Sequence, residues 1–244
     1  NETNDIAFDN TFLTELDFLK YGLFSQASKS FMDGRLDFTI GFRMDDNSYT
    51  EESGTLLKTF SPRTAISYVL DPNFKWRLSA SLGQYYKIAP YTILGYQDQA
   101  GNFSNKDVPY IGSFHAVLGL ERKLGQFAKI SAEGFFKRYT NYPISIADGV
   151  SLANKGADFS VLGNEEVVSD GLGRTYGLEL FYQQKLQKNF YGILAYTFFK
   201  SEFTGLDGGD RPSVWDSWHL FSFTGGYKLP GNWEFSVRYR YAGI

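Results

Sequence analysis

The chain has 244 residues, a formal net charge of −3 and no cysteine, which excludes disulfides, thiolate metal sites and thiol nucleophiles. A net negative chain offers no basic footprint for phosphates, so nucleic acid is not expected as a partner. Aromatic residues make up 18% of the chain, and 25 glycines supply turn chemistry, which together favour many strands over helices.

Short and long connections alternate along the sequence. Five tight turns are predicted, at Met32-Asp33-Gly34, Asp71-Pro72-Asn73, Gly125-Gln126, Gln187-Lys188-Asn189 and Pro230-Gly231-Asn232. Four long polar connections are predicted at about residues 47–59, 88–109, 141–171 and 204–215. This alternation is typical of a transmembrane β-barrel, which has short turns on the periplasmic side and long loops outside.

The segment from Gly34 to Asp46 shows the strand pattern most clearly. Leu36, Phe38, Ile40, Phe42 and Met44 share one face, and charged or polar residues occupy the alternate positions. The same alternation recurs in the segments 74–87, 110–124, 130–137, 171–186 and 233–241. Residues 190–203 differ, because large apolar side chains fall on both faces and the polar side cannot be assigned.

Strand length separates a membrane wall from a soluble sheet. Strands of soluble proteins average about 5–6 residues, whereas these segments are long enough to span a membrane. With lipid outside, the charged face would line an aqueous or plugged lumen. Aromatic residues near both strand ends fit the interfacial belts of such barrels; those at the loop end are Tyr85, Tyr86, Tyr110, Tyr139, Trp215 and Trp218.

Short motifs in a fixed order resemble the barrel of TonB-dependent outer-membrane receptors, particularly those of Bacteroidetes-like organisms. They are Phe60-Ser61-Pro62-Arg63, the run Leu78 to Gly83, the run Gly173 to Leu180, Ala195-Tyr196-Thr197, Trp215-Asp216 with His219, Gly226-Tyr227, and Tyr239-Arg240-Tyr241. Trp218 departs from the pattern, since the family usually has Arg before the His. The resemblance implies an all-β, antiparallel up-and-down transmembrane barrel portion of about ten long strands.

The resemblance also implies a function and partners. Residues 1–244 would be a single barrel region of a larger receptor, without its plug or last strands, in the bacterial outer membrane. The receptor would import a scarce nutrient, such as a siderophore, cobalamin, a glycan or a peptide, with outer-membrane lipid, the plug domain and an energy-transducing periplasmic protein as partners. It would need no cofactor and perform no covalent chemistry.

Two sets of residues are candidates for contacts within such a receptor. Ligand contacts from the extracellular loops are expected from Tyr91, Tyr96, Asp210 and Trp215. Lumen-facing contacts with plug or solvent are expected from Arg35, Arg43, Arg77, Lys137, Arg238 and Arg240.

Other motifs favour local structural roles. His115 and His219 have no metal-ligand spacing, so no metal site is predicted. Asp207-Gly208-Gly209-Asp210 is ordinary turn chemistry, with a calcium loop as the alternative. The acidic pairs Glu51-Glu52 and Glu165-Glu166 indicate solvated loop surfaces, with attraction of cations as the alternative.

Three other functions stay open at this stage. A passive porin would conduct ions without an energy source, and a soluble β-sheet binding protein would be monodisperse without detergent. An outer-membrane hydrolase would need an active site at the loop end, for example an acidic pair among Asp207, Asp210 and Asp216. No Ser-His-Asp arrangement can be assembled from the sequence.

Overall fold

The computed structural model describes residues 14–51, 54–155 and 164–243. One antiparallel sheet contains every strand, and its path follows the chain except for one short strand, β9, which pairs with β8. The strands are β1 (Lys20–Phe31), β2 (Leu36–Asn47), β3 (Ser61–Val69), β4 (Trp76–Lys87), β5 (Ile111–Leu124), β6 (Ala128–Ser145), β7 (Val167–Gln187), β8 (Phe190–Thr204), β9 (Asp210–Pro212), β10 (His219–Leu229) and β11 (Trp233–Gly243). The predicted up-and-down order is therefore confirmed.

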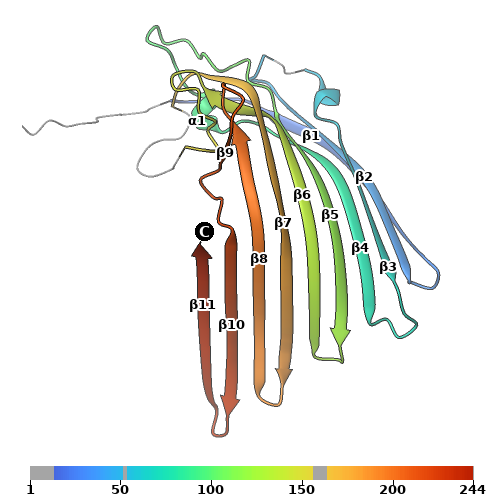
Figure 1. Ribbon diagram of the computed structural model, residues 1–244. Coiled ribbons are helices and arrows are strands. Elements are labelled where there is room, and N and C mark those ends of the chain that lie inside the picture. The colour runs from blue at the N-terminus through green and yellow to red at the C-terminus, as the bar shows by residue number, and fades with distance from the viewer. Residues whose placement is uncertain (1–13, 52–53, 156–163, 244) are drawn as a thin grey trace, which may run out of the picture.

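All five predicted tight turns lie at one end of the sheet, and the long connections lie at the other (Figure 1). Positive φ angles mark four of these turns, at Met32 and Asp33, at Gly125, at Lys188 and Asn189, and at Gly231 and Asn232. The turn after β3 is fixed by the Asp71 carboxylate, whose Oδ1 accepts from the backbone N–H groups of Lys75 and Trp76 at 2.8 and 2.7 Å. Burial would raise the pKa of Asp71, but hydrogen bonds from the backbone N–H groups, led by that of Trp76, lower it.

The strand register extends the two-faced pattern across the whole sheet. Directly opposed residues share a face, and a row such as Leu120, Ala132, Leu180, Tyr196 and Phe221 crosses from β5 to β10 on the apolar face. The register also assigns residues 190–203. Thr197 and Ser201 of β8 lie on the polar face, opposite Glu179 and Thr175.

The long connections are shorter or more ordered than predicted. The predicted connection 141–171 is too wide, because β6 continues to Ser145 and β7 begins at Val167. Pairing there is irregular between Tyr139 and Ile144, and Asn141 has a positive φ of 56°, a bulge that interrupts the alternation used to predict strands. The connections also contain a 3-10 turn, η1 (Leu56–Thr59), and a short helix, α1 (Tyr91–Leu94).

Within the described residues, no helix combines the length and the apolar character needed to cross a membrane.

The buried hydrophobic cluster lies among the long connections. Its members come from two of them and from the adjoining strand end: Ile88, Ala89, Ile93, Leu94, Val108, Leu152 and Val167. The apolar face of the strands, by contrast, is exposed along its length, as Leu118 at 58% and Val237 at 58% illustrate. An exposed apolar wall and a buried loop core are the reverse of a soluble sandwich.

Candidate functional site

The four long connections pack into one body, here called the loop cap (residues 48–51, 54–60, 88–110, 146–155, 164–166 and 205–218). Backbone hydrogen bonds join its parts: Glu51 N donates to Lys106 O at 2.9 Å, and Val214 N donates to Ala153 O at 2.9 Å. Tyr49 packs against the hydrophobic cluster and donates from Oη to Leu94 O at 2.8 Å. Burial raises the pKa of Tyr49.

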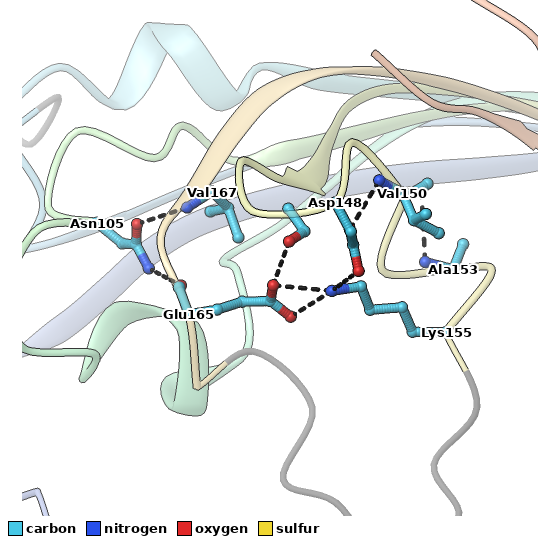
Figure 2. A network of polar contacts seen from close by, with 9 residues as sticks. Asn105, Asp148, Val150, Ala153, Lys155, Glu165 and Val167 are labelled. Carbon is cyan, nitrogen blue, oxygen red and sulfur yellow. Dashed lines mark hydrogen bonds and ion pairs between the residues drawn. The ribbon is translucent and has the colours of Figure 1, made fainter. Parts of the chain in front are cut away.

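Asn105 is the central polar residue of the loop cap and is fully buried. Its Nδ2 donates to Ile93 O at 2.8 Å. The same Nδ2 donates to Glu165 O at 2.8 Å, and Oδ1 accepts from Val167 N at 3.1 Å (Figure 2). One amide thus joins the connection after β4 to the connection before β7. Sequence reasoning missed Asn105, because two of its three partners lie 60 and 62 residues away and no local pattern marks them.

Glu165 carries a second part of this network. Both of its carboxylate oxygens accept from Lys155 Nζ at 2.8 Å, and Ser145 Oγ also donates to it (Figure 2). Lys155 Nζ lies 2.9 Å from Asp148 Oδ2 as well. The interpretation of Glu165 as a solvated surface residue was therefore wrong, whereas Glu52 of the other acidic pair lies outside the described residues.

Hydrogen bonding shifts the pKa values of Asp148 and Lys155 in this network. Burial would raise the pKa of Asp148, but the hydrogen bonds from Lys155, the Val150 N–H and Ser145, together with the charge of Lys155, outweigh it and the pKa is lowered. Burial would lower the pKa of Lys155, but its hydrogen bonds to Glu165 and Asp148 raise it. The contribution of Asp148 to stability is present above its ordinary pKa and is lost as the pH falls through the lowered value. The contribution of Lys155 is present below its ordinary pKa and is lost only at alkaline pH.

We expect Lys155→Met to destabilise the full-length receptor by about 1 to 2 kcal/mol near neutral pH, because Glu165 loses its charged donor. The difference in thermal unfolding between wild type and variant should persist from about pH 5 to pH 9 and shrink below about pH 4. Thermal scans of the detergent-solubilised receptor at several pH values measure this. A pH-independent difference would show that Lys155 acts through packing alone.

The loop cap folds over the polar face of the sheet. At the loop end of that face, Thr175 is 8% exposed, and Ser201 is fully buried. At the same level the apolar face stays open, with Phe136 at 41% and Tyr176 at 39%. The covered interior therefore lies on the charged side of the sheet.

Aromatic side chains fill the contact between cap and sheet. Phe203 is 1% exposed, and its ring centroid lies 4.6 Å from that of Tyr142, 5.2 Å from Tyr139 and 5.7 Å from Trp215. Gly173 lies opposite Phe203, and any Cβ at this position would collide with the Phe203 ring. This packing corrects the predicted loop-end belt. Tyr139, like Tyr85, lies on the polar face and not on the apolar one.

An open cleft of about 690 Å³ lies beside the cap, where the loop ends of β1 to β4 meet residues 88–91. Three of its cations lie on or next to the polar-face positions: Lys20, Arg63 and Lys87. Lys20 Nζ donates to Tyr91 Oη at 3.0 Å, and the Arg63 guanidinium lies 4.3 Å from the centre of the Tyr85 ring. Among the described residues no carboxylate lies within ion-pair distance of these three cations.

The two carboxylates in the cleft wall are already satisfied. Asp45 accepts two hydrogen bonds from Arg43, each of 2.6 Å. Asp46 is buried and accepts from Tyr21 Oη at 3.1 Å and from Gly54 N at 2.8 Å. The cleft therefore presents unpaired positive charge together with tyrosine rings, which suits anionic groups carried on a planar or apolar body.

The predicted ligand-contact residues fall into two groups. Tyr91 lines the cleft, whereas Tyr96 follows α1 and is half-buried within the cap. Trp215 donates from Nε1 to Ser201 Oγ at 3.1 Å, and Asp210 accepts from Arg174 Nη2 at 2.8 Å. Tyr91 alone of the four lines this cleft, and the ligand contacts of all four stay a prediction.

The predicted lumen-facing residues share one face. The register places Arg43, Arg77, Lys137, Arg238 and Arg240 on the polar face, and Arg35 directly precedes β2 at the same parity. Arg77 Nη1 donates to Asp37 Oδ2 at 3.2 Å and to Ser67 Oγ at 2.9 Å. Their contacts with a plug or with lumen water stay a prediction.

The alternative sites gain no support from the geometry. The Asp207 carboxylate binds Arg211 at 2.6 and 2.9 Å, and Asp210 binds Arg174, so arginines neutralise both carboxylates of the proposed calcium loop. The hydrogen bond to Arg211 lowers the pKa of Asp207. A Ser113 Oγ to His115 Nε2 contact of 2.8 Å exists on the polar face, but the charged neighbours of His115 are the cations Lys137 and Arg63. Two cations oppose the imidazolium that a base activating serine must form.

Solved outer-membrane transporters have a similar fold. The E. coli transporter YddB matches with a TM-score of 0.66 at 13% identity, over 93% of this chain and 33% of that one. The ferripyoverdine receptor of Pseudomonas aeruginosa, bound to ferripyoverdine, matches with a TM-score of 0.64 at 18% identity, over 93% of this chain and 28% of that one. The alcaligin receptor FauA of Bordetella pertussis matches with a TM-score of 0.60 at 17% identity, over 93% of this chain and 37% of that one. This chain thus spans about a third of the length of these proteins, and the likeness concerns the fold.

The family model described as TonB dependent receptor-like, beta-barrel matches residues 2–244. No curated protein matches the chain. The ordered strand motifs, the two-faced sheet and the family match agree: the chain belongs to the TonB-dependent receptors of the Gram-negative outer membrane and is part of their β-barrel.

Proposed function

We propose that this chain is the ligand-facing wall of an active importer for a scarce nutrient of the siderophore, cobalamin, glycan or peptide class. The observation that carries the proposal is the loop cap, which is packed over the polar face around its own core. A preassembled surface loses little conformational entropy when it binds a ligand. A cap of this kind is suited to capturing a nutrient at low concentration.

The partners in this proposal are a plug domain, an energy-transducing periplasmic protein and the nutrient. The six cations of the polar face would contact the plug or lumen water, and the apolar face would contact outer-membrane lipid. Among the nutrients, the unpaired Lys20, Arg63 and Lys87 favour one that carries carboxylate, phenolate or phosphate groups. The chain itself would perform no covalent chemistry.

Energy dependence distinguishes an importer from a porin. We expect cells with the full-length receptor to accumulate one nutrient class from a panel of labelled ferric siderophores, cobalamin, glycans and peptides. Accumulation should stop when the proton gradient across the inner membrane is dissipated. Steady ion conductance of the purified receptor in bilayers, with uptake that survives dissipation, would establish a passive porin instead.

The cleft gives a residue-level test of ligand chemistry. Lys20→Gln should weaken binding of the imported nutrient to the purified receptor about tenfold, because a charge-assisted hydrogen bond is lost. Lys75→Gln, at an exposed turn on the opposite end of the sheet, is the matched control and should bind as wild type. Equal affinities for wild type and Lys20→Gln would place the ligand elsewhere on the cap.

A further inference from the structure

On the central strands of the sheet, the outward, apolar face carries charged residues only at two borders, one on the turn side and one on the loop side. Along β6 the outward positions run from Ile130, which is paired with Arg122, through Ala132, Gly134 and Phe136 to Arg138. At about 3.3 Å per residue, the eight steps from Ile130 to Arg138 span roughly 26 Å along the strand, which is a rise of roughly 20 Å across the membrane at a strand tilt of about 40°. The apolar band of outer-membrane barrels is about 25 Å tall, so Arg122 and Arg138 lie near its two borders, with Arg138 on the loop side.

Arg138 lies directly opposite Arg174 of the neighbouring strand. Like charges in opposed positions destabilise a sheet unless counter-charges are present. Arg174 has them, since it binds Glu202 and Asp210 at 2.9 and 2.8 Å. Arg138 is exposed, and no carboxylate of the described residues forms an ion pair with it.

A third cation lies on the outward face near this pair. Lys200 opposes Tyr176, one step toward the apolar band from Arg174, and its Nζ lies 4.3 Å from the centre of the Trp218 ring. No carboxylate among the described residues forms an ion pair with Lys200 either. Arg138 and Lys200 therefore flank the neutralised Arg174 and leave positive charge at headgroup depth.

Aromatic residues border these cations on the membrane side. Phe136 and Tyr176 lie opposite each other one step below Arg138 and Arg174, and both are about 40% exposed. An aromatic pair beneath a cationic pair suits a ligand with acyl chains below and a phosphate above. The long loops place this border at the outer leaflet, whose glycolipid, lipid A, carries phosphates on a sugar backbone.

We propose that Arg138 and Lys200, with Arg174 between them, form a binding site for a phosphate group of lipid A on the outer wall of the barrel. Arg138 supplies a planar guanidinium that can donate two parallel hydrogen bonds to phosphate oxygens. Lys200, held against Trp218, supplies a second positive charge.

The test uses the full-length receptor, delipidated in detergent, with lipid A and dephosphorylated lipid A as probes in native mass spectrometry. The wild-type receptor should bind the added lipid A, and Arg138→Gln should bind it about tenfold more weakly. Arg122→Gln is the matched control, because Arg122 is an exposed arginine on the same face at the opposite border. It should bind lipid A as wild type does.

Arg138→Lys separates a charge effect from misfolding, since it should restore most of the binding. Three outcomes would overturn the proposal: equal retention of dephosphorylated lipid A, equal weakening by Arg122→Gln, or equally effective competition by phosphatidylglycerol. The last would mean a general attraction to anionic lipid.

Discussion

Asn105→Ala is expected to open the loop cap without unfolding the sheet. The substitution removes three hydrogen bonds of a fully buried amide and leaves Ile93 O, Glu165 O and Val167 N without their partner. Buried backbone groups left unsatisfied are costly, so the cap should lose about 3 kcal/mol. Ligand affinity of the receptor should fall with it, because the binding surface would no longer be preassembled.

Hydrogen exchange of the full-length receptor measures this opening. Backbone amides of residues 88–110 should lose roughly a hundredfold of their protection, the equivalent of about 3 kcal/mol, while those of β5 and β6 keep theirs. Asn102→Ala is the matched control, since among the described residues the Asn102 side chain hydrogen-bonds only to Asp98 within its own loop. Unchanged protection in Asn105→Ala would show that the hydrophobic cluster alone holds the cap together.

Phe203→Ala is expected to have the largest effect on stability. Phe203 is the largest of the fully buried side chains in the described part of the protein, and three aromatic rings surround it. Removing a buried phenyl ring costs about 3 to 5 kcal/mol, because the cavity that remains collapses only partly. The cap would lose its main contact with the polar face.

Thermal unfolding of the purified receptor in detergent measures the loss. Phe136→Ala gives the comparison, because Phe136 lies on the open face at 41% exposure and detergent can fill the space. Its effect should be clearly smaller than that of Phe203→Ala. Equal losses of thermal stability in the two variants would contradict a tightly packed contact between cap and sheet.

The sequence predicted the sheet well and its loops poorly, for a physical reason. Alternation of apolar and polar residues is a local signal, so the strands, turns and polar-face cations could be assigned from it. Parity alone would also have placed Tyr85 and Tyr139 on the polar face, yet position near a strand end suggested an interfacial belt. At the bulge near Asn141 the alternation itself fails, and the ends of β6 and β7 were missed.

The loop contacts depend on residues far apart in the chain. Nothing near Asn105 indicates that its amide meets Glu165, and nothing near Phe203 indicates that Trp215 folds back onto it. Such contacts arise only after the sheet has brought the loop ends together. Of the predicted ligand contacts, only Tyr91 lies in the cationic cleft; its place in a long polar connection was the available signal, and its contact with Lys20, 71 residues away, was not.

The shared core of the loop cap also limits how such a receptor can be redesigned. Because Leu94, Leu152 and Val167 belong to one cluster and Tyr49 packs against it, grafting a single loop from a relative would remove packing partners from the other loops. Transplanted specificity should therefore require exchanging the loops as a set. Diversification of ligand preference in this protein would proceed through the solvent-facing side chains of the cleft, where substitutions leave the cluster intact.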